Sequence, residues 1–417
     1  MSESVEEHYR SLLQLPSPWQ VTSVDSDLAG QSVIVRVAWP SRVKAPCPDC
    51  GKLCPIHDRL EERSWRHLSV MQYKLELRCR LPRCRCEEHA VKAIKTPWAE
   101  PGSRFTLSFE AWAIEVMLAC SSLARACELL RIHWSSAQRI IDRAVERGMA
   151  ARSTEGLARV GLDEKSFLRG QSYVSLMTDL DKARVLEVVD GRKAADIQGL
   201  WMALPEQVRK GVLAAAMDMG APFIAATGKV APHVEIVHDR FHVSKPLGEA
   251  VDKTRREESA KLAAKGDDTL KRTRYLWLHG TVPEKGRERF EELLEINLKT
   301  SKAWLFKEQM VEFWNQPDAQ SAAEFFELWR RSVMRSRIPA MKKVAATLKA
   351  HLGGLLSYFR HRITNALTEG FNSKIQSIRA DARGFRSFAN YRARILFFCG
   401  RLDLYPAGFE PNTHTKT

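Results

Sequence analysis

The sequence predicts a multidomain α/β protein, and three features support this class. Short β-rich runs alternate with helical ones between residues 157 and 243. Six of the 9 cysteines lie between Cys47 and Cys86, ahead of any long helical pattern. Much of the remaining chain carries apolar residues at helical spacing. With 417 residues the chain is long enough for roughly two to four domains.

The charge balance indicates a polyanionic partner. Lys and Arg number 65 against 50 Asp and Glu, a net charge of +15 that favours nucleic acid first and an anionic membrane second. No run of about 18 apolar residues is present, and "MSESVEEHYR" is unlike a signal peptide. We therefore expect a cytoplasmic protein with no membrane partner. In such a reducing compartment, clustered cysteines favour metal binding over disulfides.

Residues 1–100 are expected to form a small zinc-binding β module. "WQVTSVDSD" and "QSVIVRVAW" alternate around Gly30 and predict a hairpin. Two pairs with two-residue spacing follow, and together they form the preferred tetrahedral Zn²⁺ site: Cys47, Cys50, Cys86 and His89. Competing ligands are Cys54, His57, Cys79 and Cys84. The alternative to any metal site is a small core of reduced cysteines.

Residues 101–152 are expected to form a helix-turn-helix DNA-binding domain. "FEAWAIEVMLACS", "SLARACELLRI" and "SSAQRIIDRAVERG" are three segments with helical periodicity, and Ser135 is a candidate cap for the third. The third helix would present Gln138, Arg139 and Arg143 to double-stranded DNA. The alternative is an ordinary three-helix subdomain.

Residues 157–245 have the element order of a ribonuclease H-like domain. The order is strand, two-stranded hairpin, helix, strand, helix, strand, with "KAADIQGLWMALPEQVRK" as the first helix. Residues 246–360 are helical and Trp-rich, and we expect these tryptophans to be core residues and not a base-stacking platform. Residues 361–402 would complete the α/β core with a long helix, capped by Thr364 or Asn365 and reaching at least Ile378.

Three carboxylates stand at corresponding places in this predicted domain. Asp163 lies in the first strand, Asp218 closes the fourth, and Glu369 begins the final helix. In a ribonuclease H-like sheet the first and fourth strands are neighbours, so these acids would share one space and repel unless hard cations neutralise them. Two Mg²⁺ or Mn²⁺ ions held there suit phosphoryl transfer on DNA. The alternative is that each acid is a turn or cap residue.

Several motifs resemble the ISL-three family of bacterial insertion-sequence transposases, of the DDE class. They are "CPDCG", "VGLDEKSF", "AAAMDMGAPF", "HDRFHVSK" and "TNALTEGFNSKIQSIRADARGFRSFANYRARI", in the family's order over nearly the whole chain. The resemblance implies that Asp163, Asp218 and Glu369 are the catalytic DDE residues and that residues 246–360 are an insertion. The chain departs from the family at "LPRCRCEEHAV", where members often carry "RRFRC" and further cysteines.

We expect Asp239 and His242 to end the last predicted strand, and they are similar to a signature in Mutator-like and hAT-type transposases in which two residues separate an Asp from a His. We interpret them as supporting or DNA-positioning groups, with a turn that caps the strand as the alternative. Further DNA contacts are expected from the final helix and the segment after it: Asn372, Lys374, Gln376, Arg379, Arg383 and Arg386, with Arg392 and Arg394 beyond.

The sequence thus predicts a DNA transposase that binds the terminal inverted repeats of its element and performs metal-dependent cleavage and strand transfer. Cutting two ends together implies a homodimer or larger assembly on DNA. The resemblance also implies a bacterial protein, nucleoid-associated when bound to DNA. One rival is a transposase-derived, non-catalytic DNA-binding regulator, although all three acids are present. A ribonuclease H-like nuclease would not need the zinc and helix-turn-helix modules.

Overall fold

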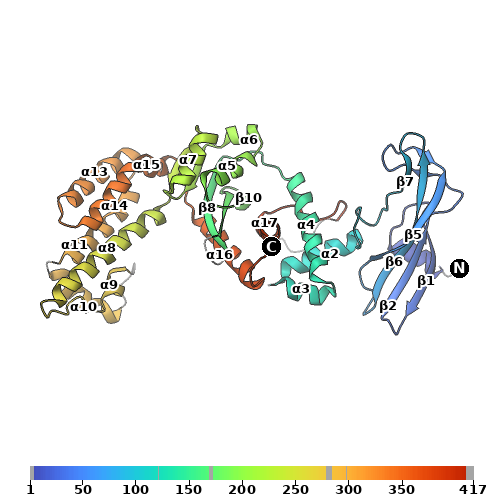
Figure 1. Ribbon diagram of the computed structural model, residues 1–417, viewed down its shortest axis with the longest axis horizontal. Coiled ribbons are helices and arrows are strands. Elements are labelled where there is room, and N and C mark those ends of the chain that lie inside the picture. The colour runs from blue at the N-terminus through green and yellow to red at the C-terminus, as the bar shows by residue number, and fades with distance from the viewer. Residues whose placement is uncertain (1–3, 121, 169–171, 279–283, 297, 410–417) are drawn as a thin grey trace. The chain divides into compact units, whose positions relative to one another are not determined.

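The computed structural model describes residues 4–120, 122–168, 172–278, 284–296 and 298–409. The chain forms two compact units, one of Met1–Arg152 with Leu402–Thr417 and the other of Ser153–Arg401 (Figure 1). The five-segment division expected from the sequence stays a prediction. Within the described ranges, no helix is both long and apolar enough to cross a membrane.

A β-sheet forms the first part of the first unit. Its elements are α1 (Val5–Leu12), β1 (Gln20–Asp27), β2 (Ser32–Ala38), β3 (Ala45–Pro46), β4 (Leu53–Cys54), β5 (Ile56–Arg66), β6 (Lys74–Cys86) and β7 (Ala90–Ala93). The strand order is β1-β2-β6-β5, with β7 paired to β6. The predicted hairpin is present as the antiparallel pair β1 and β2. In β2, buried side chains alternate with half-buried ones because successive residues point to opposite faces.

Three helices follow in the same unit: α2 (Leu107–Ala119), α3 (Leu123–Leu130) and α4 (Trp134–Ala151). Thr106 and Ser122 cap α2 and α3 by accepting hydrogen bonds from backbone N–H groups three residues on. The prediction that Ser135 caps α4 is wrong. The N-cap is His133, because its ring nitrogen accepts the backbone N–H of Ser135 and the helix starts two residues earlier than expected.

The second unit contains a five-stranded mixed sheet. Its elements are β8 (Arg159–Leu168), β9 (Ser172–Asp179), β10 (Arg184–Asp190), α5 (Ala194–Met202), α6 (Glu206–Gly211), β11 (Ala214–Met217), α7 (Ala221–Val230) and β12 (Glu235–His238). The strand order is β10-β9-β8-β11-β12, in which the first three strands form an antiparallel meander and the last two are parallel to β8. The single helix predicted after β10 is two helices, because Pro205 separates α5 from α6.

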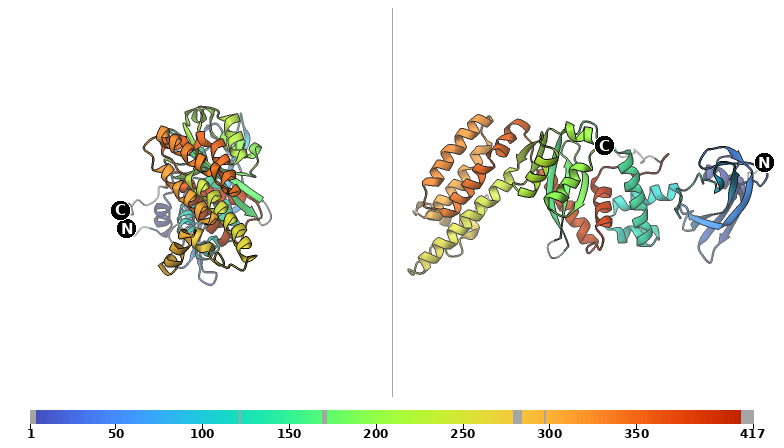
Figure 2. Two further views of the ribbon diagram at one scale, coloured as in Figure 1. Left: turned by 90° about the vertical axis from the view of Figure 1, so that its left-hand side faces the viewer. Right: turned by 45° about the horizontal axis from the view of Figure 1, so that its top comes forward.

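A helical module is inserted after β12. Its helices are α8 (Arg240–Ala263), α9 (Arg274–Leu278), α10 (Glu284–Glu295), α11 (Lys299–Gln309), α12 (Val311–Trp314), α13 (Ala319–Arg335), α14 (Pro339–Ala350) and α15 (Leu352–His361). Figure 2 shows α8 extending from the sheet into this module. Trp277 and Trp329 are buried in its apolar core, and Trp304 and Trp314 pack against that core. The prediction that these tryptophans are core residues is confirmed.

The chain then returns to the sheet through α16 (Ala366–Asp381) and α17 (Phe388–Cys399). Val160 and Leu162 of β8 belong to the apolar core beneath α5 and α7. The alternate positions Gly161 and Asp163 face α16, so the two faces of the sheet are covered by different helices. The predicted long helix is present, and it begins after Asn365.

The close approach of α16 to β8 depends on Gly161. A Cβ atom at this position would lie closer than 3.0 Å to side-chain oxygens of Thr368, Thr178 and Asn365. The first two of these residues also touch each other, with their Oγ1 atoms 2.9 Å apart. All of these groups are buried, so there is little room for them to move aside. The absence of a side chain at Gly161 therefore fixes where α16 begins on the sheet.

Gly161→Ala should destabilise the second unit by about 1–3 kcal/mol, because overpacking forces α16 away from β8. Gly370→Ala is the matched control, since a Cβ there meets nothing within 4 Å and the position is exposed within α16. The control should stabilise the protein by about 0.5–1 kcal/mol. Urea unfolding of both variants measures the difference, and equal midpoints would contradict the packing role of Gly161.

Candidate active site and zinc site

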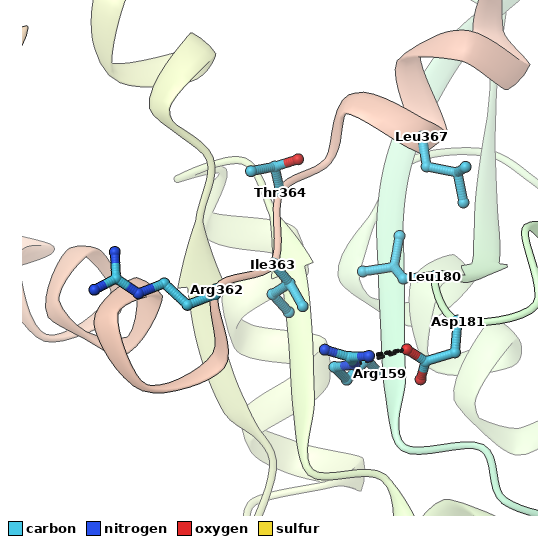
Figure 3. A pocket seen from close by; sticks show the side chains of 7 residues that line it. All are labelled: Arg159, Leu180, Asp181, Arg362, Ile363, Thr364 and Leu367. Atoms are coloured by element: carbon cyan, nitrogen blue, oxygen red, sulfur yellow. Dashed lines mark hydrogen bonds and ion pairs between the residues drawn. The ribbon is translucent and has the colours of Figure 1, made fainter. Parts of the chain in front are cut away.

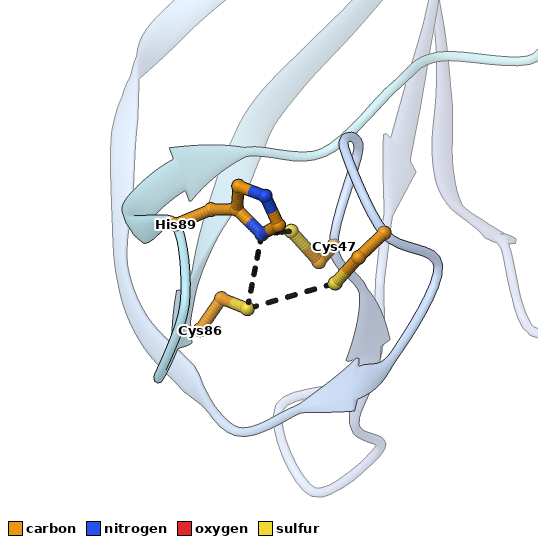
Figure 4. Close-up of side chains that lie close together, drawn as sticks. Cys47, Cys86 and His89 are labelled. Atoms are coloured by element: carbon orange, nitrogen blue, oxygen red, sulfur yellow. Dashed lines mark hydrogen bonds between the residues drawn. The ribbon is translucent and has the colours of Figure 1, made fainter.

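Four metal-ligating side chains meet at one end of the N-terminal sheet. Cys47 and Cys50 flank the turn between β3 and β4, while Cys86 ends β6 and His89 precedes β7. The Sγ atoms of Cys50 and Cys86 are 3.7 Å apart, and Nδ1 of His89 lies 3.7 Å from Sγ of Cys86 and 3.9 Å from Sγ of Cys47 (Figure 4). All four ligand atoms lie within 4.8 Å of one another.

These separations suit a tetrahedral zinc ion. With metal–sulfur bonds of about 2.3 Å and metal–nitrogen bonds of about 2.0 Å, ligand atoms at the corners of a tetrahedron are roughly 3.5–3.8 Å apart. The hydrogen bond with His89 lowers the pKa of Cys86 to about 6, which favours the thiolate form that binds metal. The donor set and the geometry therefore both fit Zn²⁺, and the preferred ligand set from the sequence is the one that the fold assembles.

The competing ligands are engaged elsewhere. Burial raises the pKa of Cys79 to about 12 and that of Cys54 to about 11, so both thiols stay protonated. Cys84 is fully buried, and its thiol donates to the carbonyl of Pro46 at 3.9 Å. Nδ1 of His57 accepts a hydrogen bond from Arg85 at 3.0 Å. These four residues contribute to the module's core and surface and not to the metal cluster.

In the second unit, three aspartates belong to neighbouring parallel strands: Asp163 lies within β8, Asp218 directly follows β11 and Asp239 directly follows β12. β11 pairs with β8 so that Ala216 lies opposite Gly161, and two residues further on the same register places Asp218 beside Asp163. Continuing the register of β11 with β12 places Asp239 on the other side of Asp218. Adjacent strands are about 4.8 Å apart. The prediction that the first and fourth strands of this domain, β8 and β11, are neighbours in the sheet is therefore confirmed.

Helix α16 brings a further carboxylate to this row. Nδ2 of Asn372 donates a hydrogen bond to Oδ2 of Asp163 at 2.5 Å. Glu369 precedes Asn372 by three residues and so lies on the same face of the helix. Burial raises the pKa of Glu369, and the negative charges of Asp239 and Asp163 raise it further. Burial also raises the pKa of Asp163, although the hydrogen bonds from the Glu164 N–H and from Asn372 oppose this rise.

Asp239 and His242 do not end the strand as the sequence suggested. β12 ends at His238, Asp239 is the N-cap of α8, and His242 lies in the first turn of that helix. The physical reason is that Oδ1 of Asp239 accepts the backbone N–H of Phe241 at 2.7 Å and thereby starts the helix. Its Oδ2 accepts the backbone N–H of Asn365, the N-cap of α16. One buried carboxylate therefore holds the first turns of two helices.

His242 lies against Asp218. Its Nδ1 is 3.7 Å from Oδ1 of Asp218, whose side chain remains 48% exposed. Nε2 of His242 and Oδ1 of Asn372 are buried, and neither has a hydrogen-bond partner among the described residues. Pro246 lacks an N–H, so the carbonyl of His242 also loses its usual helical donor. The site therefore presents donors and acceptors that the protein alone does not satisfy.

The carboxylates are more widely spaced than the zinc ligands. Among the residues that the structure describes, the Cys47 cluster is the one group of three or more metal-ligating residues whose ligand atoms lie within 4.8 Å of one another. Asp163, Asp218 and Glu369 share one neighbourhood through the strand register and through Asn372, but their oxygens do not converge on a single point.

A pocket of about 260 Å³ lies near the start of β8 (Figure 3), and Asp163, Asp218 and Asp239 are not among the residues that line it. Its lining residues are Arg159, Leu180, Asp181, Arg362, Ile363, Thr364 and Leu367. The carboxylate in it, that of Asp181, is paired with the guanidinium of Arg159. This pairing neutralises the acid, so the pocket does not offer the anionic ligands that the aspartate row provides.

Three family models match the chain in the order of its modules. Residues 44–89 match the zinc-finger of transposase IS204/IS1001/IS1096/IS1165, and residues 94–145 match the helix-turn-helix domain of transposase family ISL3. A third model of the same family, described as Transposase, matches residues 160–395, more than half of the chain. The chain belongs to transposase family ISL3. The resemblance read from the sequence motifs is thereby confirmed.

Curated relatives agree with this family. The transposase for insertion sequence element IS1557 of Mycobacterium tuberculosis is 26% identical over 390 residues, which are 86% of each chain. The transposase for insertion sequence element IS1001 of Bordetella parapertussis is 23% identical over 387 residues, 90% of this chain and 95% of that one. This ISL3 protein is thus a DNA-binding transposase with a zinc-binding module and a helix-turn-helix.

In the helix-turn-helix of this transposase, the three predicted DNA-facing side chains have different environments. Arg139 is exposed on α4. Gln138 is only 6% exposed, and its Nε2 donates to Asp142 at 2.8 Å. Arg143 pairs with the fully buried carboxylate of Glu110. Of the three, Arg139 is the one that remains accessible, whereas Gln138 is bonded within α4 and Arg143 joins α4 to α2.

The predicted DNA-contacting residues at the end of the transposase also divide into two groups. Exposed side chains are those of Lys374, Gln376, Arg383 and Arg386, although Nζ of Lys374 also donates to the carbonyl of Phe398 at 3.0 Å. Engaged side chains are those of Arg379, which donates to the carbonyl of Ser166, Arg392, which pairs with Glu187, and Arg394, which is 7% exposed. Arg379 and Arg392 attach the last two helices to the sheet, and Arg394 lies over the ring of Phe385.

Sequence reasoning missed two groups beside the aspartate row. Asn365 was expected only as a cap, yet its Nδ2 also donates to the carbonyl of Leu162 at 3.4 Å. Burial raises the pKa of Glu164, as do the charges of Asp163 and Asp218. Glu164 follows Asp163 directly in "LDEK", which is the signal that could have found it. The contact of Asn365 with β8 has no signal in the sequence, because it joins residues 203 positions apart.

Cys86→Ser should remove zinc from the N-terminal module, since it replaces a thiolate ligand, while Cys79→Ala should keep it. Metal analysis is expected to find one zinc per chain in the parent protein and in the control, and much less in Cys86→Ser. A strong chelator should lower the unfolding temperature of the parent, because metal binding and folding of such a module are coupled. Retention of zinc by Cys86→Ser would refute the ligand set.

Proposed function

We propose that this transposase cuts DNA at the terminal inverted repeats of its element and joins the ends to a target by metal-dependent phosphoryl transfer. The observation that carries the proposal is the lateral alignment of Asp163 with Asp218, together with the hydrogen bond that ties Asp163 to the helix of Glu369. These acids come from β8, from the end of β11 and from α16, which are distant in sequence. Their meeting supports a shared chemical role.

The strand order supports a ribonuclease H-like catalytic domain. An antiparallel meander of β8, β9 and β10 is followed by β11 and β12, which join the other side of β8 in parallel. In open α/β sheets, sites lie beyond the carboxyl ends of parallel strands, where Asp218 and Asp239 stand. The helical module then enters immediately after β12, so it extends from the rim of the proposed site.

Hydrogen bonding distinguishes the second catalytic acid from its neighbour. Both oxygens of Asp239 accept backbone N–H groups, and its side chain is buried. Asp218 is half exposed, and one of its oxygens accepts the N–H of Met219. We therefore assign Asp163, Asp218 and Glu369 as the catalytic acids and Asp239 as the residue that positions two helices around them.

The donor set fits Mg²⁺ or Mn²⁺. Carboxylate and amide oxygens are the ligands that these hard cations prefer, and the buried Oδ1 of Asn372 adds one such oxygen without a partner among the described residues. The raised pKa values of Asp163 and Glu369 show that their ionised forms are poorly compensated by the protein. Two bound ions would supply activation of the attacking hydroxyl and stabilisation of the leaving oxygen.

The chain's own side chains would orient this chemistry. Asn372 holds Oδ2 of Asp163, which fixes one carboxylate against β8. His242 stands beside Asp218, its Nε2 is buried without a hydrogen-bond partner among the described residues, and a phosphate oxygen of DNA is a suitable partner for that nitrogen. Lys374, Gln376, Arg383 and Arg386 are the accessible groups on and after α16 for phosphate contacts further along the strand.

The N-terminal unit would recognise the element's ends. Its zinc module and helix-turn-helix match family models of those kinds, and Arg139 is an exposed cation on α4. A homodimer or larger assembly on DNA is proposed because two ends must be cut together. The cytoplasmic, nucleoid-associated location expected from the sequence stays a prediction.

Asp218→Asn should abolish Mg²⁺- or Mn²⁺-dependent cleavage of labelled DNA that carries the element's ends, because it removes a charged ligand without changing shape. Asp163→Asn and Glu369→Gln should act likewise, and all three should bind the ends normally in gel-shift assays. Asp239→Asn is the contrasting variant. It keeps one acceptor oxygen of two, so it should lose about 1 kcal/mol of stability, seen as a lower unfolding midpoint in urea.

A metal readout separates ligand loss from simple misfolding. Because folding raises the pKa of Asp163, the protonated carboxyl contributes to the stability of the folded protein at acid pH. This contribution is lost as the pH rises through the pKa that Asp163 has in the folded state. Added Mn²⁺ should therefore raise the unfolding temperature of the parent at neutral pH, and Asp163→Asn should lose this increase. Normal cleavage by Asp218→Asn would reject the assignment, and binding without cleavage by the parent protein would favour the non-catalytic regulator.

Arg139→Ala should weaken binding to the element's ends and reduce the dependence of log affinity on log salt by about one unit, as expected for one lost phosphate contact. Arg143→Ala is the matched variant on the same helix. It should instead destabilise the N-terminal unit, because the carboxylate of Glu110 would be buried without its cation. An unchanged salt slope in Arg139→Ala would argue against contact with DNA through this residue.

A further inference from the structure

The second unit exposes an aromatic ring beside the proposed active site. Phe241 is 57% exposed, although it lies in the first turn of α8 between Asp239 and His242. Most other rings of the unit are buried or half-buried, including the tryptophans of the helical module. Among its described residues, Tyr275 on α9 is the other exposed aromatic, at 47%. Exposure of a Phe at this place is not explained by packing.

The surroundings of Phe241 suit a nucleic-acid strand. Its ring centroid is 6.0 Å from that of His242, whose Nδ1 is 3.7 Å from Asp218. One imidazole therefore separates the exposed ring from a proposed catalytic carboxylate. Arg240 precedes Phe241 and Lys245 follows one turn later, and both are exposed. A ring flanked by cations is the arrangement by which proteins hold unstacked bases and the adjoining backbone.

We propose that Phe241 stacks on an unpaired nucleobase of the element's end next to the phosphate that is cut. This inference rests on the proposed function, because it requires DNA at the aspartate row. The base would be a neighbour of the scissile phosphate that has left the helical stack, and the ring would replace its lost stacking partner. Arg240 and Lys245 would hold the phosphates on either side.

The position of Phe241 is well suited to this role. Its backbone N–H donates to Asp239, so the residue is held by the same carboxylate that positions α16. The backbone of Phe241 is therefore held close to the start of α16, while its ring stays exposed. Substitution of the side chain keeps the backbone N–H, and the cap on α8 stays intact in every variant except proline.

The test compares cleavage by Phe241→Ala on two DNA ends, one fully paired and one with a mismatch beside the cut. Loss of base stacking should slow cleavage of the paired end by roughly 5- to 150-fold, the range that corresponds to removal of one aromatic–base stack. The mismatched end needs less energy to open and should restore much of the rate. Phe241→Trp should cleave the paired end at the parent rate, because it keeps a stacking surface.

Tyr275→Ala is the matched control, since it removes another exposed ring from a different helix and should cleave both ends at the parent rate. Equal rates for Phe241→Ala and the parent would overturn the inference, as would slowing of both ends by the same factor. Absence of cleavage by the parent protein would instead overturn the proposed function, so the two failures are distinguishable.

Discussion

The carboxylate of Asp239 joins the beginnings of two helices that lie 126 residues apart in the chain. It caps α8, which leads away from the sheet into the helical module. It also accepts the backbone N–H of Asn365, the N-cap of α16, where the chain has returned to the sheet. A buried carboxylate is stable only when its oxygens are satisfied, and these two N–H groups satisfy them. Because both helices are held by one residue, His242 and Glu369 keep fixed positions around Asp218.

The sheet supplies the complementary constraint. Parallel pairing of β8, β11 and β12 sets three aspartates in one lateral row, and repulsion between them must be relieved in some way. The charge of Asp239 is compensated by backbone N–H groups. Asp163 accepts hydrogen bonds from the Asn372 side chain and from the Glu164 N–H. Asp218 stays half exposed. The three aspartates therefore have different roles because the fold brings different hydrogen-bond donors to each of them.

A similar division is found among the cysteines and arginines. Cys47 and Cys79 are both buried, yet only the former stands where three other ligand atoms lie within bonding range of one metal position. Arg139 and Arg143 lie one turn apart on α4, but the latter is committed to Glu110. Residue type alone indicates the chemistry that is available, whereas the surrounding contacts decide whether a side chain is free to use it.

The sequence by itself determined most of the order of elements and the four side chains of the metal-ligand cluster, and it suggested the three acids that we propose as catalytic. These features depend on local spacing: two residues between paired ligands, alternation in the β2 segment, and an Asp directly after an apolar run. Only the tertiary structure decided the role of Asp239, the cap at His133 and the inward orientation of Gln138 and Arg143. Those outcomes depend on donors and acceptors contributed by distant segments, such as Asn365 to Asp239, and no local pattern records such a contact.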